Sequence, residues 1–159
     1  MIRIDVIENN NEKKRISRAV LESLPEWFGI EIAREEYIED SAKQTMAAAY
    51  DGEQEVGFIC LNETGRDTVE LHVLGVLKAY HRKGIGSMLF KKAREIAAAS
   101  GYSFIQVKTV AMGNYPEYDA TNKFCLSLGF KEFEVIPELW GEENPCQIYV
   151  MMCTPSDSV

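Results

Sequence analysis

The stretch HRKGIGS, residues 81–87, lies between the apolar segment LHVLGVL (residues 71–77) and the Ala-rich segment MLFKKAREIAAAS (residues 88–100). The apolar segment predicts a strand, and the Ala-rich segment predicts the helix that follows it. His81, Arg82 and Lys83 precede the start of this helix, and no acidic residue follows them before Glu95. Cations at the N-terminal end of a helix oppose its dipole, whereas an anion is favoured there. The pattern therefore indicates an anion-binding loop.

Two nucleotide-binding patterns do not fit this loop. A phosphate-binding loop of the G-x-x-x-x-G-K-[ST] type requires a lysine directly after the second glycine, but Lys83 precedes Gly84. A dinucleotide fingerprint requires a third glycine, where Leu89 stands, and an acidic residue at the end of the next strand, which ends in Thr-Val. Two interpretations stay open: a plain turn, and a loop for a pyrophosphate such as that of coenzyme A.

Hydrophobic periodicity and turn residues predict the elements on both sides of the loop. The expected strands are residues 1–7, 45–52, 55–64, 68–77, 102–110, 130–137 and 146–153, and the expected helices are residues 9–24, 31–42, 84–100 and 117–129. Some strands are joined by tight turns and others by helices, which requires a mixed sheet covered by helices. We predict an α/β (α+β) fold with a mostly antiparallel sheet of about seven strands and about four helices, in one domain over residues 1–159.

Composition limits the classes of function and partner. The chain has 159 residues, 46% of them hydrophobic, and a net charge of -8, which argues against nucleic acid or an anionic membrane as the main partner. No apolar run is long enough to cross a bilayer, and the N-terminus lacks a signal peptide, so we expect a cytoplasmic protein. Four cysteines without a C-x-x-C pair, and only two histidines, predict reduced thiols and no metal site.

Three segments resemble the GNAT family of N-acetyltransferases. The segment VLGVLKAYHRKGIGSMLFKKARE (residues 73–95) resembles the acetyl-CoA-binding segment of that family, a strand followed by Q/R-x-x-G-x-G/A and a helix. The segment TNKFCLSLGF (residues 121–130) resembles its late helix ending in Gly-Phe. The segments FIQVKTV (residues 104–110) and ELWGEENPCQIYV (residues 138–150) resemble a bacterial branch of the family whose substrate is unassigned. Two positions depart from the pattern: His81 replaces the usual Gln or Arg, and Cys125 stands where a tyrosine general acid is common.

The resemblance implies the GNAT fold, acetyl-CoA as co-substrate and no metal. Backbone groups at the end of the strand would meet the pantetheine, and backbone amides of the loop would hold the pyrophosphate. The implied cofactor-binding residues are Leu74, Gly75, Val76, His81, Arg82, Lys83, Gly84, Ile85, Gly86 and Ser87. Asn122 is a further candidate for the cofactor, and its alternative is a solvent-facing helix residue.

The implied reaction is direct attack of a primary amine on the thioester, which needs a base because alkylamines are mostly protonated at neutral pH. Glu70 is the first candidate for the base and His72, two residues along the same strand face, is the second. Tyr118 or Cys125 would protonate the leaving thiolate, with a small core thiol as the alternative for Cys125. The opposing hypothesis is a weakly active or inactive coenzyme A-binding sensor or interaction module.

The acceptor substrate is not determined by these patterns. Two features are candidates for lining its site: aromatic side chains at Trp27, Phe28, Tyr37 and Trp140, and the acidic residues Glu35, Glu36 and Glu39. The ordinary alternatives are core packing for the aromatic residues and a solvated helix face for the acidic ones. A homodimer is compatible with the exposed edge of such a sheet.

Overall fold

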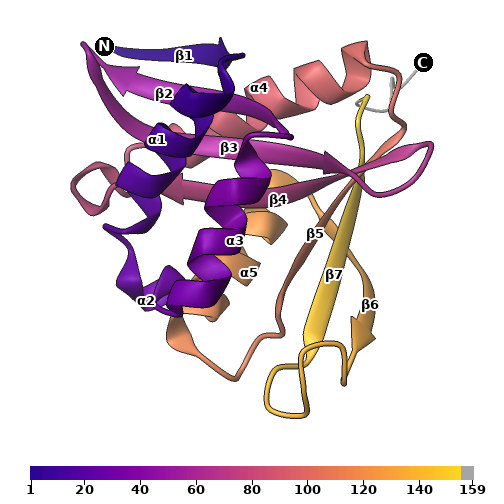
Figure 1. Cartoon of the computed structure of the whole chain (residues 1–159). Helices are drawn as coiled ribbons and strands as arrows, with labels where there is room; N and C mark the ends of the chain where they lie inside the picture. The colour runs from indigo at the N-terminus through magenta and orange to yellow at the C-terminus, as the bar shows by residue number, and fades with distance from the viewer. Residues whose placement is uncertain (155–159) are drawn as a thin grey trace. The chain divides into compact units, whose positions relative to one another are not determined.

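A computed structural model of the chain describes residues 1–154 (Figure 1). The strands are β1 (Ile2–Ile7), β2 (Thr45–Asp51), β3 (Gln54–Glu63), β4 (Thr68–Val76), β5 (Phe104–Val110), β6 (Lys131–Ile136) and β7 (Cys146–Met152). The helices are α1 (Asn10–Leu21), α2 (Pro25–Phe28), α3 (Glu31–Ser41), α4 (Ile85–Ala99) and α5 (Pro116–Leu128), with a 3₁₀ turn η1 at Lys78–Tyr80.

The strands form one seven-stranded sheet in the order β1-β2-β3-β4-β5-β7-β6. The pairs β1–β2, β2–β3, β5–β7 and β6–β7 are antiparallel, and the pair β4–β5 is parallel. The predicted mixed, mostly antiparallel sheet is therefore confirmed. The described residues contain five α-helices, one more than expected, because Pro25 begins the four-residue helix α2 instead of only ending α1.

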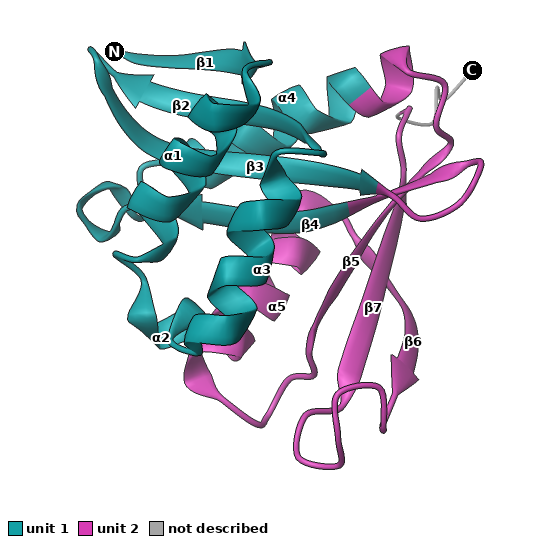
Figure 2. Ribbon diagram, viewed as in Figure 1, with its two compact units in different colours: residues 1–62, 71–96 teal, residues 63–70, 97–159 magenta. Residues whose placement is uncertain are grey.

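The contacts divide the chain into two compact units (Figure 2). Unit 1 comprises residues 1–62 and 71–96, and unit 2 comprises residues 63–70 and the chain from residue 97 onward. The boundary falls inside two elements, so that β4 and α4 each contribute residues to both units.

Unit 1 packs helices on both faces of its strands. Ile16 and Val20 of α1 and Ile38 of α3 are fully buried in a cluster that includes Phe58 of β3. The next residue along β3, Gly57, points to the other face, where a Cβ atom would lie 3.3 Å from Leu89 Cδ1 of α4. The alternation of a strand thus separates a face covered by α1 and α3 from one covered by α4.

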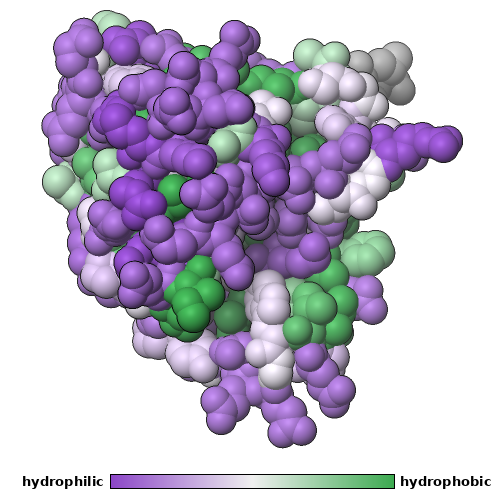
Figure 3. Space-filling view, viewed as in Figure 1, coloured by the Kyte–Doolittle hydropathy of each residue, from purple (hydrophilic) through white to green (hydrophobic). Residues whose placement is uncertain are grey.

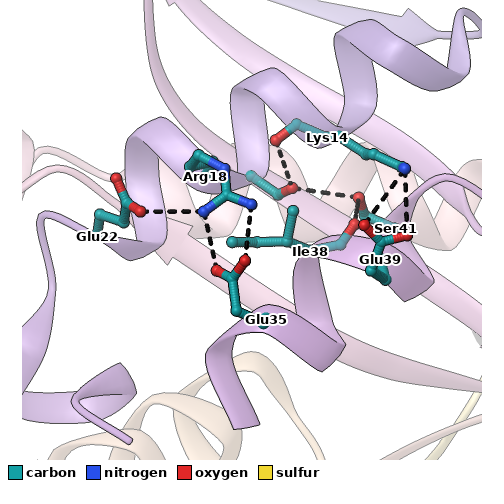
Figure 4. A network of polar contacts seen from close by, with 8 residues as sticks. Lys14, Arg18, Glu22, Glu35, Ile38, Glu39 and Ser41 are labelled. Atoms are coloured by element: carbon teal, nitrogen blue, oxygen red, sulfur yellow. Dashed lines mark hydrogen bonds and ion pairs between the residues drawn. The ribbon is translucent and has the colours of Figure 1, made fainter. Parts of the chain in front are cut away.

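A polar network joins α1 to α3, with ion pairs at the surface and a pair of buried serine hydroxyls (Figure 4). Arg18 makes a two-bonded ion pair with Glu35, with both N–O distances at 2.8 Å, and a further contact with Glu22. Lys14 pairs with Glu39, and the Ser17 hydroxyl lies 3.1 Å from that of Ser41. The surface over α1 and α3 is accordingly mostly hydrophilic (Figure 3).

Unit 2 packs α5 against strands β5 and β7. The helix ends at Gly129, whose φ of 101° is left-handed, and the Phe130 N–H returns to the Cys125 carbonyl, as in a common helix-ending motif. Tyr149 of β7 is buried and donates its hydroxyl to the Asn122 side chain of α5 at 2.5 Å. This bond fixes the helix on the sheet within the unit.

Candidate functional site

The loop before α4 has an unusual backbone. Arg82 has a φ of 63° and Gly84 a φ of 77°, both in the left-handed region. Alternation of left-handed and right-handed residues turns successive N–H groups to the same side, which forms a concave anion-binding surface. A Cβ atom at Gly84 would meet nothing within 4 Å, so the space beside this backbone is open. The residues present therefore fit a phosphate group held by main-chain amides at the start of a helix.

Side-chain contacts stabilise the loop of residues 81–87 and connect it to neighbouring elements. His81 Nε2 lies 2.6 Å from the Val76 carbonyl, and because a carbonyl can only accept, Nε2 is the donor. The Lys83 ammonium lies 5.1 Å from the centre of the Tyr80 ring, and Tyr80 donates its hydroxyl to Asp51 at 2.7 Å. His81 thus connects the loop to the end of β4, and Arg82 and Lys83 stay exposed beside the loop amides.

The end of β4 leaves little room for side chains. At Gly75 a Cβ atom would lie 2.9 Å from Val20 Cγ1, so a larger residue would displace α1. The parallel register of β4 with β5 includes Thr68, Val69 and Glu70.

Glu70 lies in unit 2 with a partner that sequence reasoning missed. Its side chain is buried, with the residue 8% exposed, and accepts a bond from Lys108 Nζ of β5 at 3.0 Å. A buried carboxylate without a polar partner would be costly, and Lys108 provides that partner. The only signal available in the sequence was a lysine within a predicted strand.

His72 lies in unit 1 with different partners. Its Nδ1 atom contacts the side-chain amide of Gln44, and its ring lies 5.0 Å from the ring of Tyr37 at an angle of 46°. Sequence reasoning did not single out Gln44, which stands 28 positions away. Glu70 and His72 are thus neighbours in sequence that are held by separate sets of residues.

The two candidate proton donors lie on α5 and differ in environment. Burial raises the pKa of Tyr118, with further contributions from Glu117 and Tyr115, so the phenol keeps its proton at neutral pH. Burial raises the pKa of the Cys125 thiol to about 12. Transfer of a proton from such a thiol to an ordinary thiolate, of pKa about 8.5, is uphill by about 4–5 kcal/mol. This environment favours the core interpretation of Cys125 and leaves the half-buried Tyr118 as the remaining candidate donor.

Asn122 is fully buried and has no polar hydrogen left for a ligand. It donates to the carbonyls of Val110 and Tyr118 at 2.8 and 2.7 Å, and it accepts from Tyr149. The alternative that Asn122 faces solvent is therefore wrong, since none of its surface is exposed. The predicted role in cofactor binding also has no support, because protein groups already occupy both amide hydrogens.

The candidate acceptor-site residues lie in different environments. The carboxylates of Glu35 and Glu39 are paired with Arg18 and Lys14, so most of their charge is neutralised within the helix pair. The rings of Phe28 and Tyr37 meet edge-on, with their centres 5.6 Å apart, and Tyr37 in turn contacts the His72 ring. Trp27 contacts His81 in the same manner at 5.9 Å, whereas Trp140 lies in unit 2 and is 44% exposed.

Residues 1–154 contain neither a metal-binding cluster nor a membrane-spanning helix. No cluster of three or more His, Cys, Asp or Glu side chains among them is placed to hold a metal ion. None of the helices in that range has the length and apolar character required to traverse a membrane.

Comparisons with known proteins show which family the chain resembles. A model of the Acetyltransferase (GNAT) family matches residues 13–125 and so draws on both units. No curated protein sequence matches the chain.

Solved structures resemble the chain over nearly its whole length. An aminoglycoside 6'-acetyltransferase type Ii is 25% identical, with a TM-score of 0.75, over 98% of this chain and 99% of that one. An aminoglycoside 6'-N-acetyltransferase in complex with coenzyme A is 20% identical, with a TM-score of 0.73, over 97% and 99% of the two chains. A protein from Desulfovibrio desulfuricans assigned to the GNAT family is 16% identical, with a TM-score of 0.78, over 97% and 100%. The last two likenesses show the fold, and the family model covers most of the sequence. With the loop geometry, they lead to one conclusion: this chain belongs to the GNAT family of acetyltransferases.

Proposed function

We propose that the protein is an acetyl-CoA-dependent N-acetyltransferase that transfers the acetyl group to a primary amine by direct attack. The observation that carries this proposal is the loop of residues 81–87, with left-handed Arg82 and Gly84 at the start of α4. Its amides fit a pyrophosphate, and the family membership makes coenzyme A the source of that pyrophosphate. We also propose that both units together serve as one acetyltransferase domain.

Binding uses the loop and the end of β4. The amides from Arg82 to Ser87 hold the pyrophosphate, and the exposed charges of Arg82 and Lys83 add attraction. Backbone groups of Leu74, Gly75 and Val76 meet the pantetheine as an added strand would. His81 supports this arrangement by its bond to the Val76 carbonyl. Acetyl-CoA, when bound, supplies an activated acyl group, and backbone N–H groups of β4 stabilise the charge that develops on the carbonyl oxygen.

The remaining chemistry is proton transfer. An alkylammonium with a pKa near 10 must lose its proton before it can attack. Glu70, paired with Lys108, accepts this proton directly or through water. Tyr118, which keeps its own proton at neutral pH, donates to the leaving thiolate.

A cationic acceptor fits the charge of the chain. The net charge is -8, which favours the approach of polyamines and amino sugars. Several structural neighbours are aminoglycoside 6'-acetyltransferases, and one of them is 25% identical to this chain. We therefore place aminoglycosides first in an acceptor panel, followed by polyamines, lysine peptides and peptide N-termini. The four free thiols fit a reducing, cytoplasmic location.

One observation favours a second candidate, a coenzyme A-binding module without turnover. The position where the family often carries a tyrosine donor holds Cys125, a buried thiol with a pKa of about 12. A module of this kind would bind coenzyme A tightly and acetylate none of the amines.

Two measurements test the proposal. Acetyl-CoA at a concentration 100-fold above its dissociation constant should stabilise the protein by about 3 kcal/mol, whereas ATP should not. Release of coenzyme A, followed with dithionitrobenzoate across the acceptor panel, should show amine-dependent turnover. Binding without turnover would favour the module, and protection by ATP alone would refute the interpretation of the loop.

A further inference from the structure

Gln44 is a buried polar residue held rigidly at its backbone. It follows α3 and is 7% exposed. Its N–H donates to the Ser41 carbonyl at 3.2 Å, and its carbonyl accepts a bond at 2.7 Å from the ammonium of Lys13, itself buried. Burial of the Lys13 ammonium costs free energy unless the ammonium is hydrogen-bonded, so its bond to the Gln44 carbonyl is strongly favoured. The position from which the Gln44 side chain extends is therefore strongly fixed.

The side-chain amide of Gln44 meets one partner, His72. The amide nitrogen lies 3.0 Å from Nδ1 of the imidazole, nearer than the amide oxygen at 3.3 Å. An amide nitrogen can donate but cannot accept. In this shorter contact Nδ1 accepts with its lone pair, an arrangement that places the proton of the neutral ring on Nε2.

The rest of the ring is also constrained. The Tyr37 ring lies against the imidazole at 5.0 Å, which limits its rotation. His72 is half-buried, and both of its contacts with the Gln44 amide involve Nδ1. Within residues 1–154 the buried side-chain polar atoms without a partner do not include Nε2 of His72, so solvent reaches this nitrogen. The imidazole thus has a fixed inner nitrogen and an accessible outer nitrogen that carries hydrogen.

We propose that Gln44 is a positioning residue that holds His72 as the Nε2–H tautomer, so that His72 offers a hydrogen-bond donor to the substrate instead of acting as a base. The group that such a donor recognises is an oxygen, and the acceptor class it favours is an amine that also carries hydroxyl or ether oxygens, as amino sugars do. Removal of the amine proton then belongs to Glu70. This role rests on the proposed transferase function, but the state of the ring does not.

Nitrogen NMR of the histidine-labelled protein tests the tautomer without any substrate. The chain has only two histidines, and the His72→Gln variant identifies which signals belong to His72. At a pH where the signals no longer change on further addition of base, we expect an unprotonated Nδ1 and a protonated Nε2. In Gln44→Glu the carboxylate can only accept, so Nδ1 should gain a proton. A protonated Nδ1 in the unmodified protein would overturn the proposal, whether or not the variant folds.

Kinetics test the role of the ring. His72→Gln keeps an N–H donor but cannot take up a proton, so it should retain several-fold more kcat/KM than His72→Leu, which should lose roughly tenfold or more. Gln44→Glu, which should move the proton to Nδ1, should also lower kcat/KM. Gln54→Glu makes the same charge change at an exposed position of β3 and should not lower kcat/KM. Equal losses in His72→Gln and His72→Leu would identify a base and refute the donor role. If the unmodified protein acetylates no amine, the proposed function fails while the NMR result still decides the tautomer.

Discussion

Among single residues, Glu70 has the most direct consequence for activity. Glu70→Gln keeps the shape of the side chain but removes its ability to accept a proton. We expect kcat to fall about 100-fold or more, with the dissociation constant of acetyl-CoA unchanged. Steady-state kinetics and calorimetry check the two parts. Retention of full turnover in this variant would remove Glu70 from the mechanism.

The backbone of Gly84 provides a second test. Gly84→Ala forces an L-residue into a left-handed conformation, at a cost of about 1–2 kcal/mol, and should distort the loop amides. We expect the affinity for coenzyme A to fall roughly tenfold or more, since charge-assisted bonds are lost.

Gly52 is the matched control for Gly84. It has a φ of 63° and, like Gly84, nothing within 4 Å of an added Cβ atom, but it lies in the turn between β2 and β3. Gly52→Ala should lose similar stability in thermal unfolding and leave coenzyme A binding intact. Equal loss of affinity in both variants would show that strain, and not the loop, explains the effect.

The sequence predicted the loop and missed the partners of the candidate catalytic residues. The loop was predictable because its glycines, cations and helix start are adjacent in the chain. Lys108 and Gln44 were not, because they stand 38 and 28 positions from Glu70 and His72. Contacts of this kind depend on strand register and on the path of the chain after α3, which local patterns do not determine.

Among the elements, α5 and β7 depend on one buried bond. Tyr149→Phe removes the donor to Asn122 and leaves a buried amide oxygen without that partner. We expect the free energy of unfolding to fall by about 1–3 kcal/mol. Tyr102→Phe, which removes an exposed bond to Glu63 in the same unit, should change it by much less in the same denaturant titration. Similar losses in the two variants would contradict the role given to burial.

Hydrophobic periodicity predicts some helix boundaries well and others poorly. The predicted helix over residues 31–42 corresponds to α3 at Glu31–Ser41, because its boundaries coincide with a change of pattern. The predicted helix over residues 9–24 ends earlier, at Leu21, since the chain turns there before α2. Pro25 begins α2, because proline suits the first turn of a helix.

For the molecule as a whole, the state of the thiols is the simplest prediction. All four cysteines are free and buried. The native protein should therefore react slowly with dithionitrobenzoate, and four thiols per chain should appear in denaturant. Rapid reaction of any thiol in the native protein would contradict this burial. Silent protein thiols also allow the same reagent to report coenzyme A release without background.

Each unit contains at least one thiol that couples folding to alkaline pH. Burial raises the pKa of Cys60 in unit 1 and of Cys125 in unit 2 to about 12. In the unfolded chain these thiols ionise above pH about 8.5, so between that pH and about 12 the unfolded state binds fewer protons. Stability should then fall as pH rises, by about 1.4 kcal/mol per pH unit for each thiol. Denaturant titrations at several pH values should show that the free energy of unfolding falls less steeply with pH in Cys60→Ala than in the unmodified protein.

The network between α1 and α3 has a consequence for motion in unit 1. Of the residues in α3, only Ile38 and Ser41 are buried, whereas α1 buries five. Exposed ion pairs such as Arg18–Glu35 weaken as salt screens them. Amides of α3 should therefore exchange with deuterium sooner than those of α1, and added salt should widen the difference. Since Gln44 follows α3 directly, the frequency with which this helix opens also limits how long the His72 ring keeps a single tautomer.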